Sequence, residues 1–153
     1  MRPVPMLFVF TLMVTTLAAQ EARQSGSTDA SVAAVIAQYN RGLNGGDVNA
    51  VIAAFHADGV FMAPNQPPVS GDALRQWYAN YWTRTVAKLQ FAPASIRVEG
   101  ALAYAVVNIT GTTTPKNGGP AQQQDNKAIF VLRRGTDGAW KIAHYILNSN
   151  KRA

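Results

Sequence analysis

Two residue types that carry much of enzyme chemistry are scarce in this chain, which has 153 residues but no cysteine and only two histidines. The lack of cysteine excludes disulfide bonds, zinc sites built on thiolates, thiol nucleophiles and a lipid-modified N-terminal cysteine. The histidines, His56 and His144, stand in no His-x-His or Glu-x-x-His spacing. We therefore expect no metal site.

Charged residues are also few, at 14% of the chain, and they are not clustered. The net charge is +6, and the only adjacent basic pairs are Arg133-Arg134 and Lys151-Arg152. A glycine-rich phosphate loop is missing too, because Gly118-Gly119 leads into a proline and a strand pattern instead of a helix N-terminus. We expect a mildly basic, solvated surface, no cofactor and no nucleic-acid partner.

The N-terminus has the layout of a secretory signal peptide, which we assign to residues 1–19. Arg2 supplies the positive start, an apolar run follows from Met6 to Leu17, and Ala18-Ala19 offer a cleavage site. The run is short for a membrane span, so an uncleaved anchor is the alternative. We expect an exported protein, periplasmic or secreted, with no membrane contact after cleavage. Residues 20–28 are small and polar and predict a flexible linker, which leaves residues 29–150 for one domain.

Apolar residues at spacings of three and four predict three helices in the first half of the domain. The first helix ends at Asn44-Gly45-Gly46, and Asp47 caps a second, short helix with His56 at its end. A short strand, Val60 to Met62, and a proline-rich loop lead to a third helix that starts at Ser70 or Asp72. The apolar stripes of the three helices are Val32, Val35, Ile36, Tyr39 and Leu43, then Val51, Ile52 and Phe55, then Leu74, Trp77, Tyr78, Tyr81 and Trp82.

From Ala87 onward the apolar period changes to two, which predicts a run of long strands. Pro93 interrupts the first of them and indicates a bulge. The loop 115–120 and the turn 135–138 predict hairpins, so these strands pair antiparallel. In the last strand, Trp140, Ile142, His144 and Ile146 are expected on one face and alternate with Lys141, Ala143, Tyr145 and Leu147 on the other. Helices followed by a strand meander predict an α+β fold.

Several motifs together resemble the nuclear transport factor 2-like superfamily, in particular its SnoaL-like and steroid-isomerase-like members and an uncharacterised exported branch. The motifs are Tyr39, Asn44-Gly45-Gly46-Asp47, Phe55-His56-Ala57-Asp58-Gly59-Val60, Pro67-Pro68-Val69-Ser70-Gly71, Asp125-Asn126-Lys127, Asp137-Gly138-Ala139-Trp140-Lys141-Ile142-Ala143-His144 and Asn148-Ser149-Asn150. The resemblance implies a cone, in which a curved antiparallel sheet wraps around the N-terminal helices and encloses an apolar pocket. It also implies a homodimer through the outer sheet face.

The steroid-isomerase mechanism of the family that this chain resembles needs three groups, a tyrosine and two acids, and this chain lacks the two acids. Tyr39 matches the family's tyrosine. The family's base is an acid just before a proline, and this chain has Ala63 at that position. Its second acid lies in the penultimate strand, where this chain has Ala128-Ile129-Phe130. Alanine cannot accept a proton, so this reaction is not expected.

Three functions remain open on the sequence. The first is a domain that binds a small apolar or aromatic ligand without catalysis, in a pocket lined by Tyr39, Phe55, Phe61, Trp77, Tyr81, Phe130 and His144. The second is a cofactor-free lyase or isomerase with His144 as base, Asp125 orienting it if the strands pair in that register, and Tyr39 as donor. The third is a dimeric interaction module.

Overall fold

The computed structural model describes residue 26 and residues 29–150. The predicted leader, residues 1–19, lies outside this range, and so does the predicted linker except for Gly26. In the described part, no helix is both long and apolar enough to cross a membrane.

Three helices form in the first half of the described chain, as expected. The N-terminal helix covers residues 29–45, α2 is Val48–Ala54 and α3 is Gly71–Arg84. Asp47 caps α2 as predicted, since its carboxylate accepts a hydrogen bond from the Ala50 N–H at 3.0 Å. Asn44 ties the end of the N-terminal helix to the sheet, because its side-chain amide both donates to and accepts from the backbone of Leu89, at 2.7 and 2.8 Å.

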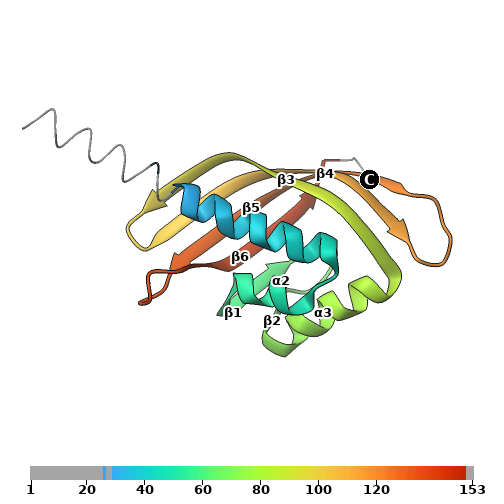
Figure 1. Cartoon of the computed structure of the whole chain (residues 1–153), viewed down its shortest axis with the longest axis horizontal. Coiled ribbons are helices and arrows are strands. Elements are labelled where there is room, and N and C mark those ends of the chain that lie inside the picture. Colours follow the sequence, from blue (N-terminus) through green and yellow to red (C-terminus); the bar gives the residue numbers. More distant parts are fainter. Residues whose placement is uncertain (1–25, 27–28, 151–153) are drawn as a thin grey trace, which may run out of the picture.

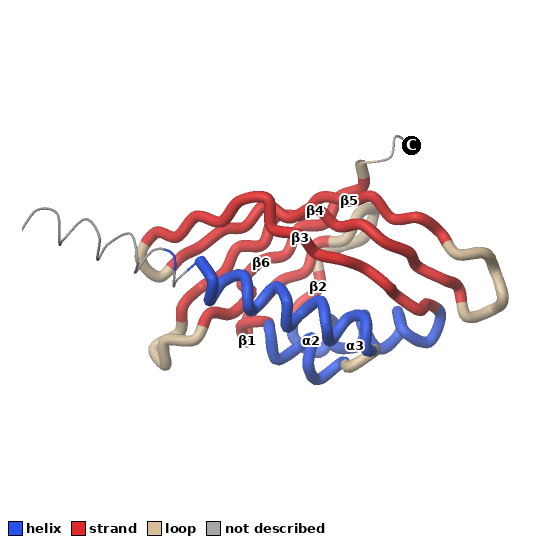
Figure 2. The backbone as a smooth tube through the Cα atoms, turned by 45° about the horizontal axis from the view of Figure 1, so that its top comes forward, coloured by secondary structure: helices blue, strands red, loops and turns tan. Residues whose placement is uncertain are grey.

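Six strands form one curved sheet with the helices on one side (Figures 1 and 2). The strands are β1 Phe55–Met62, β2 Val69–Ser70, β3 Thr85–Glu99, β4 Leu102–Pro115, β5 Gln122–Arg134 and β6 Trp140–Ser149. Their order is β2-β1-β6-β5-β4-β3. The predicted hairpins are present, and every neighbouring pair is antiparallel except β1 and β6, which run parallel. We call the face that the helices cover the inner face and the opposite one the outer face.

The predicted bulge in β3 is confirmed, since the register with β4 shifts between Pro93 and Ser95. A second bulge, in β6, was not predicted. Ile142 pairs with Leu132 and His144 pairs with Val131, so Ala143 is an extra residue. The extra residue changes which side chains face inward. Ile142 and Tyr145 are both buried, whereas His144 and Ile146 are exposed.

The expected placement of His144 and Ile146 on the same face as Trp140 and Ile142 is therefore wrong. A prediction from alternation assumes that each residue of a strand pairs with one residue of its neighbour. A single bulge adds an unpaired residue, so every side chain after it points to the opposite face from the one expected.

The core lies between the inner face and the helices and is strongly aromatic. Tyr39, Phe61, Tyr78, Phe130 and Tyr145 are each at most 2% exposed. No polar or charged residue of the described chain, tyrosine aside, is buried. The sheet thus curves around an apolar, ring-filled centre.

Candidate ligand site on the inner face of the sheet

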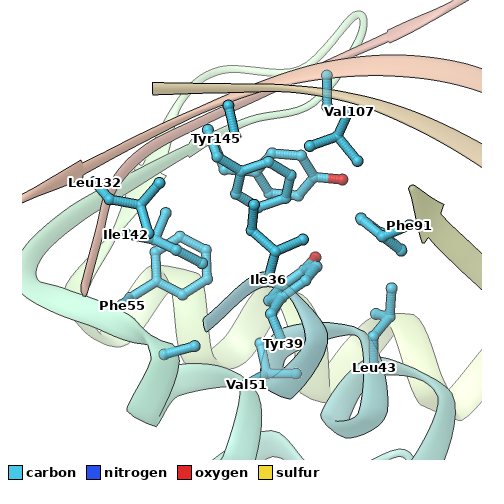
Figure 3. Close-up of a cluster of buried hydrophobic side chains, with 14 of the residues drawn as sticks. Ile36, Tyr39, Leu43, Val51, Phe55, Phe91, Val107, Leu132, Ile142 and Tyr145 are labelled. Carbon is cyan, nitrogen blue, oxygen red and sulfur yellow. The ribbon is translucent and has the colours of Figure 1, made fainter. Parts of the chain in front are cut away.

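Tyr39 stands at the centre of the core, where the N-terminal helix faces the sheet (Figure 3). Its ring makes edge contacts with five neighbours, Phe55, Tyr78, Phe91, Phe130 and Tyr145, at centroid distances of 6.0, 6.2, 5.4, 5.8 and 5.4 Å. Edge-to-face geometry is favourable for aromatic pairs, so these rings hold Tyr39 from several sides.

The hydroxyl of Tyr39 belongs to a buried chain of three phenols. The Tyr39 oxygen lies 2.7 Å from the hydroxyl of Tyr78 on α3. Tyr145 on β6 is hydrogen-bonded to Tyr39 as well. Burial raises the pKa of all three tyrosines well above the usual value. At neutral pH this group consists of uncharged phenols, which can donate hydrogen bonds but not act as bases.

Sequence reasoning missed this network, although it placed Tyr39 correctly in the helix stripe. Tyr78 was expected as one apolar member of α3, and Tyr145 was expected on the face opposite Ile142. The β6 bulge turns Tyr145 inward, so no pattern in the sequence pairs it with Tyr39.

Most of the residues predicted to line a pocket come together in or against the aromatic core. Six of the seven are linked by ring contacts, including Phe61 with Trp77 at 4.8 Å and Trp77 with Tyr81 at 5.6 Å. The seventh, His144, lies on the outer face. The main hollows over the described residues lie elsewhere, and none of them is lined by Tyr39, Phe61 or Phe130. Of the six ring residues, Phe55 borders one of these hollows, beside His56 and Arg134. An apolar pocket among the rings stays a prediction.

Outside the buried aromatic core, the side chains between α3 and the sheet are half-buried, and some of them are polar. Trp77 and Tyr81 of α3 stack at an interplanar angle of 7°, and the indole N–H of Trp77 donates to the Gln66 side chain at 2.8 Å. On the sheet side, Leu147 follows Tyr145 on the same face. Burial raises the pKa of Tyr81, so its hydroxyl is also a neutral donor.

Two amide side chains on β5 also face the inner side of the sheet. Gln124 and Asn126 alternate with exposed residues in step with buried Ala128, so they face inward. The Gln124 amide donates to the Thr113 hydroxyl at 2.8 Å, and the Asn126 amide donates to Gln124 at 3.4 Å. We call Trp77, Tyr81, Gln124, Asn126 and Leu147 the mouth surface. It combines flat apolar area with uncharged donors and acceptors.

The structure does not bring the three predicted catalytic residues together. Tyr39 is buried on the inner side, whereas His144 is exposed on the outer face opposite Val131. Asp125 lies near the other end of β5, where its carboxylate accepts a hydrogen bond from the Asn150 side chain at 2.8 Å. The register that would let Asp125 orient His144 is therefore not present.

His56 also differs from its predicted place at the end of α2. The helix ends at Ala54, and His56 lies in β1, where an irregular pairing with β6 spans Phe55 to Val60. Its imidazole contacts Asp58, and Arg133 bonds the Asp58 carboxylate at 2.7 and 2.9 Å. The guanidinium of Arg133 lowers the pKa of Asp58. This exposed cluster is on the outer face, away from the tyrosines.

Comparison with known proteins agrees with this architecture. Residues 36–145 match the model of the SnoaL-like domain. This chain belongs to the SnoaL-like domain family. None of the curated proteins compared with it matches.

Solved structures resemble this SnoaL-like domain along nearly their whole length. A ketosteroid isomerase-like protein from Erwinia carotovora atroseptica is 25% identical, with a TM-score of 0.76 over 81% of this chain and 97% of that one. A nuclear transport factor 2-like superfamily protein from Salmonella enterica is 16% identical, with a TM-score of 0.72 over 84% and 94%. A protein from Streptomyces avermitilis, proposed to be a dehydratase of the same family, is 20% identical, with a TM-score of 0.70 over 83% and 99%. The expected superfamily and cone-like fold are thus confirmed.

In this SnoaL-like domain the position expected for an acid is half-buried and apolar. Ala63 follows β1, directly before Pro64, and packs against the core. Among the described residues, no group of three or more histidines, aspartates or glutamates is placed to hold a metal ion. None of the described aspartates, glutamates or histidines is buried, so the inner face offers a ligand mainly hydrogen-bond donors and apolar area.

Proposed function

We propose that this SnoaL-like domain binds a small, flat, uncharged molecule on the mouth surface and performs no proton transfer on it. The supporting observation is the stacked pair Trp77 and Tyr81, half-buried on the same side of the sheet as the inward amides Gln124 and Asn126. An aromatic wall combined with a few placed polar groups is the usual composition of a small-molecule site. The lack of an inward acid or base argues for binding rather than catalysis.

A titration with 2-naphthol, a flat neutral molecule with one hydroxyl, tests this proposal. Its binding is followed by calorimetry and by the indole N–H resonance of Trp77. We expect Trp77→Ala and Gln124→Leu each to weaken binding by about tenfold, the scale of one lost stacking or hydrogen-bond partner.

Tyr104→Ala on the outer face is the matched control, because it removes an exposed ring of similar size, and it should leave binding unchanged. Equal affinity of the Trp77→Ala variant and the original protein would refute the mouth surface as the site.

A second candidate function, self-association, is supported by the outer face. Leu102, Tyr104, Ile129 and Ile146 are 53, 45, 43 and 42% exposed, although all lie within strands of the sheet. Two hollows of about 280 and 240 Å³ interrupt this face, one beside Ile129 and Ile146 and one beside Leu102 and Tyr104. An apolar sheet face of this kind suits a second copy of the same chain, related by a two-fold axis.

Sedimentation of the purified domain tests this second candidate. We expect a dimer that dissociates in the double variant Tyr104→Lys, Ile129→Lys, while the circular dichroism spectrum stays the same. Lys127→Gln on the same face is the control and should remain dimeric. If the unaltered protein sediments as a monomer, self-association through the outer face is refuted.

The leader-like residues 1–19 support one more part of the proposal, that the domain acts after export. The mature N-terminus, measured by mass spectrometry on protein from the native host, should then lie near Gln20. A retained Met1 would contradict a cleaved leader.

A further inference from the structure

A groove at the end of α3 lies outside the mouth surface. One hollow of about 570 Å³ is lined by residues 83–85 and 115–117, and a second of about 320 Å³ is lined by Gly45, Gly46, Trp82 and Val86 among others. The two hollows share Thr85 and Lys116, so they lie side by side, and we call them together the α3 groove. The groove runs from the end of the N-terminal helix to the base of the β4–β5 hairpin.

Gly46 lines the apolar part of the α3 groove and has no side chain to cover the Trp82 ring. Gly46 has a φ of +68°, and a Cβ there would lie 3.8 Å from the Trp82 ring. The indole N–H of Trp82 donates to the Leu43 carbonyl at 3.0 Å, which fixes the ring in place. Beside it, Val86 is 41% exposed, so ring and aliphatic surface are both accessible.

The other part of the groove is cationic. Arg84 and Lys116 line the larger hollow, and neither hollow includes an aspartate or a glutamate. Within the described residues, the ion pairs join Asp58 to His56 and Arg133, so Arg84 and Lys116 have no acidic partner there. The Lys116 backbone N–H donates to the Arg84 carbonyl at 2.8 Å, which keeps the two cationic residues next to each other.

We propose that the α3 groove binds a small aromatic carboxylate. Its flat body lies on Trp82 and Val86, and its carboxylate lies between Arg84 and Lys116. Apolar surface next to two cations that lack acidic neighbours is complementary to a molecule with one apolar and one anionic end. The mouth surface has no cation in it, so the two sites differ in the charge of the ligand they select.

Paired titrations with 2-naphthoate and the uncharged 2-naphthamide test this assignment. Binding is followed by calorimetry and by the Trp82 indole N–H resonance. We expect 2-naphthoate to shift the Trp82 resonance and 2-naphthamide to bind the groove more weakly. Arg84→Gln and Lys116→Gln should each weaken 2-naphthoate binding by about fivefold, the scale of one exposed ion pair, and added salt should weaken it further.

The matched controls are Arg97→Gln and Lys127→Gln, which remove cations beside the outer-face hollows and should leave binding unchanged. This proposal and the proposed binding to the mouth surface can fail independently. Trp77→Ala should weaken only the binding of 2-naphthol, and Lys116→Gln should weaken only the binding of 2-naphthoate. Unchanged 2-naphthoate affinity in both groove variants, or equal affinity for 2-naphthamide, would overturn the carboxylate assignment.

Discussion

The inner and outer faces of the sheet both carry large apolar side chains, but only the inner face is covered by other parts of the chain. Phe130 and Ile129 are neighbours on β5 and illustrate the contrast, with exposed fractions of 0 and 43%. The inner face is filled by rings from the helices, whereas no helix of the described chain lies over the outer face (Figure 2). The sheet is thus apolar on both sides, and the described helices cover only the inner one.

Replacing each of these neighbours by alanine should give the largest contrast between the faces. Phe130→Ala removes a ring that stacks on Tyr145 at 4.2 Å and should lower the free energy of unfolding by about 3–5 kcal/mol. Ile129→Ala, measured in the same denaturant titration at a concentration that keeps the protein monomeric, should cost less than about 1 kcal/mol. Similar losses at both positions would show that the outer face is covered too.

Alkaline pH should weaken the inner face selectively. The folded-state pKa of Tyr39, Tyr78 and Tyr145 is raised, so their stabilising effect is present below pH 10 and is lost as the pH rises above it. Each such tyrosine should cost at most about 1.4 kcal/mol per pH unit above 10, because one pKa unit corresponds to about 1.4 kcal/mol.

Thermal unfolding between pH 8 and pH 11 measures this loss. Tyr145→Phe should make the decline shallower by about one third, because it removes one of the three groups. A decline with the same slope in this variant would contradict the shared burial of the phenols.

Removing one hydroxyl should have a smaller effect. Tyr39→Phe leaves the ring contacts in place but takes away the middle of the phenol chain, so it should cost about 1–3 kcal/mol. Tyr104→Phe removes an exposed hydroxyl from the outer face and should change the free energy of unfolding by less than about 0.5 kcal/mol. Equal effects would mean that the buried hydroxyls are hydrated.

The smallest expected effect is at His144. It is exposed on the outer face, so His144→Ala should change stability by less than about 0.5 kcal/mol and leave 2-naphthol binding unchanged. Loss of an enzymatic activity in this variant, with folding intact, would support the catalytic reading that the geometry disfavours.

Local signals in the sequence predicted most of the elements correctly. The Asp47 cap, the glycines after the first helix, the interruption at Pro93 and the two hairpin loops act over a few residues, and each is found where expected. The predicted site was less accurate. The ring residues do meet, but the volume between them depends on how the side chains from several elements pack, and no sequence pattern reports that volume.

The sequence by itself determined the α+β class, the family and the missing acid at Ala63, because these depend on residue type, spacing and order along the chain. The tertiary structure decided which side chains share a face. One extra residue in β6 turns Tyr145 inward to Tyr39 and His144 outward, and that single shift separates the buried phenols from the histidine. Strand parity is a property of pairing with a neighbour, so it is set only when the sheet forms.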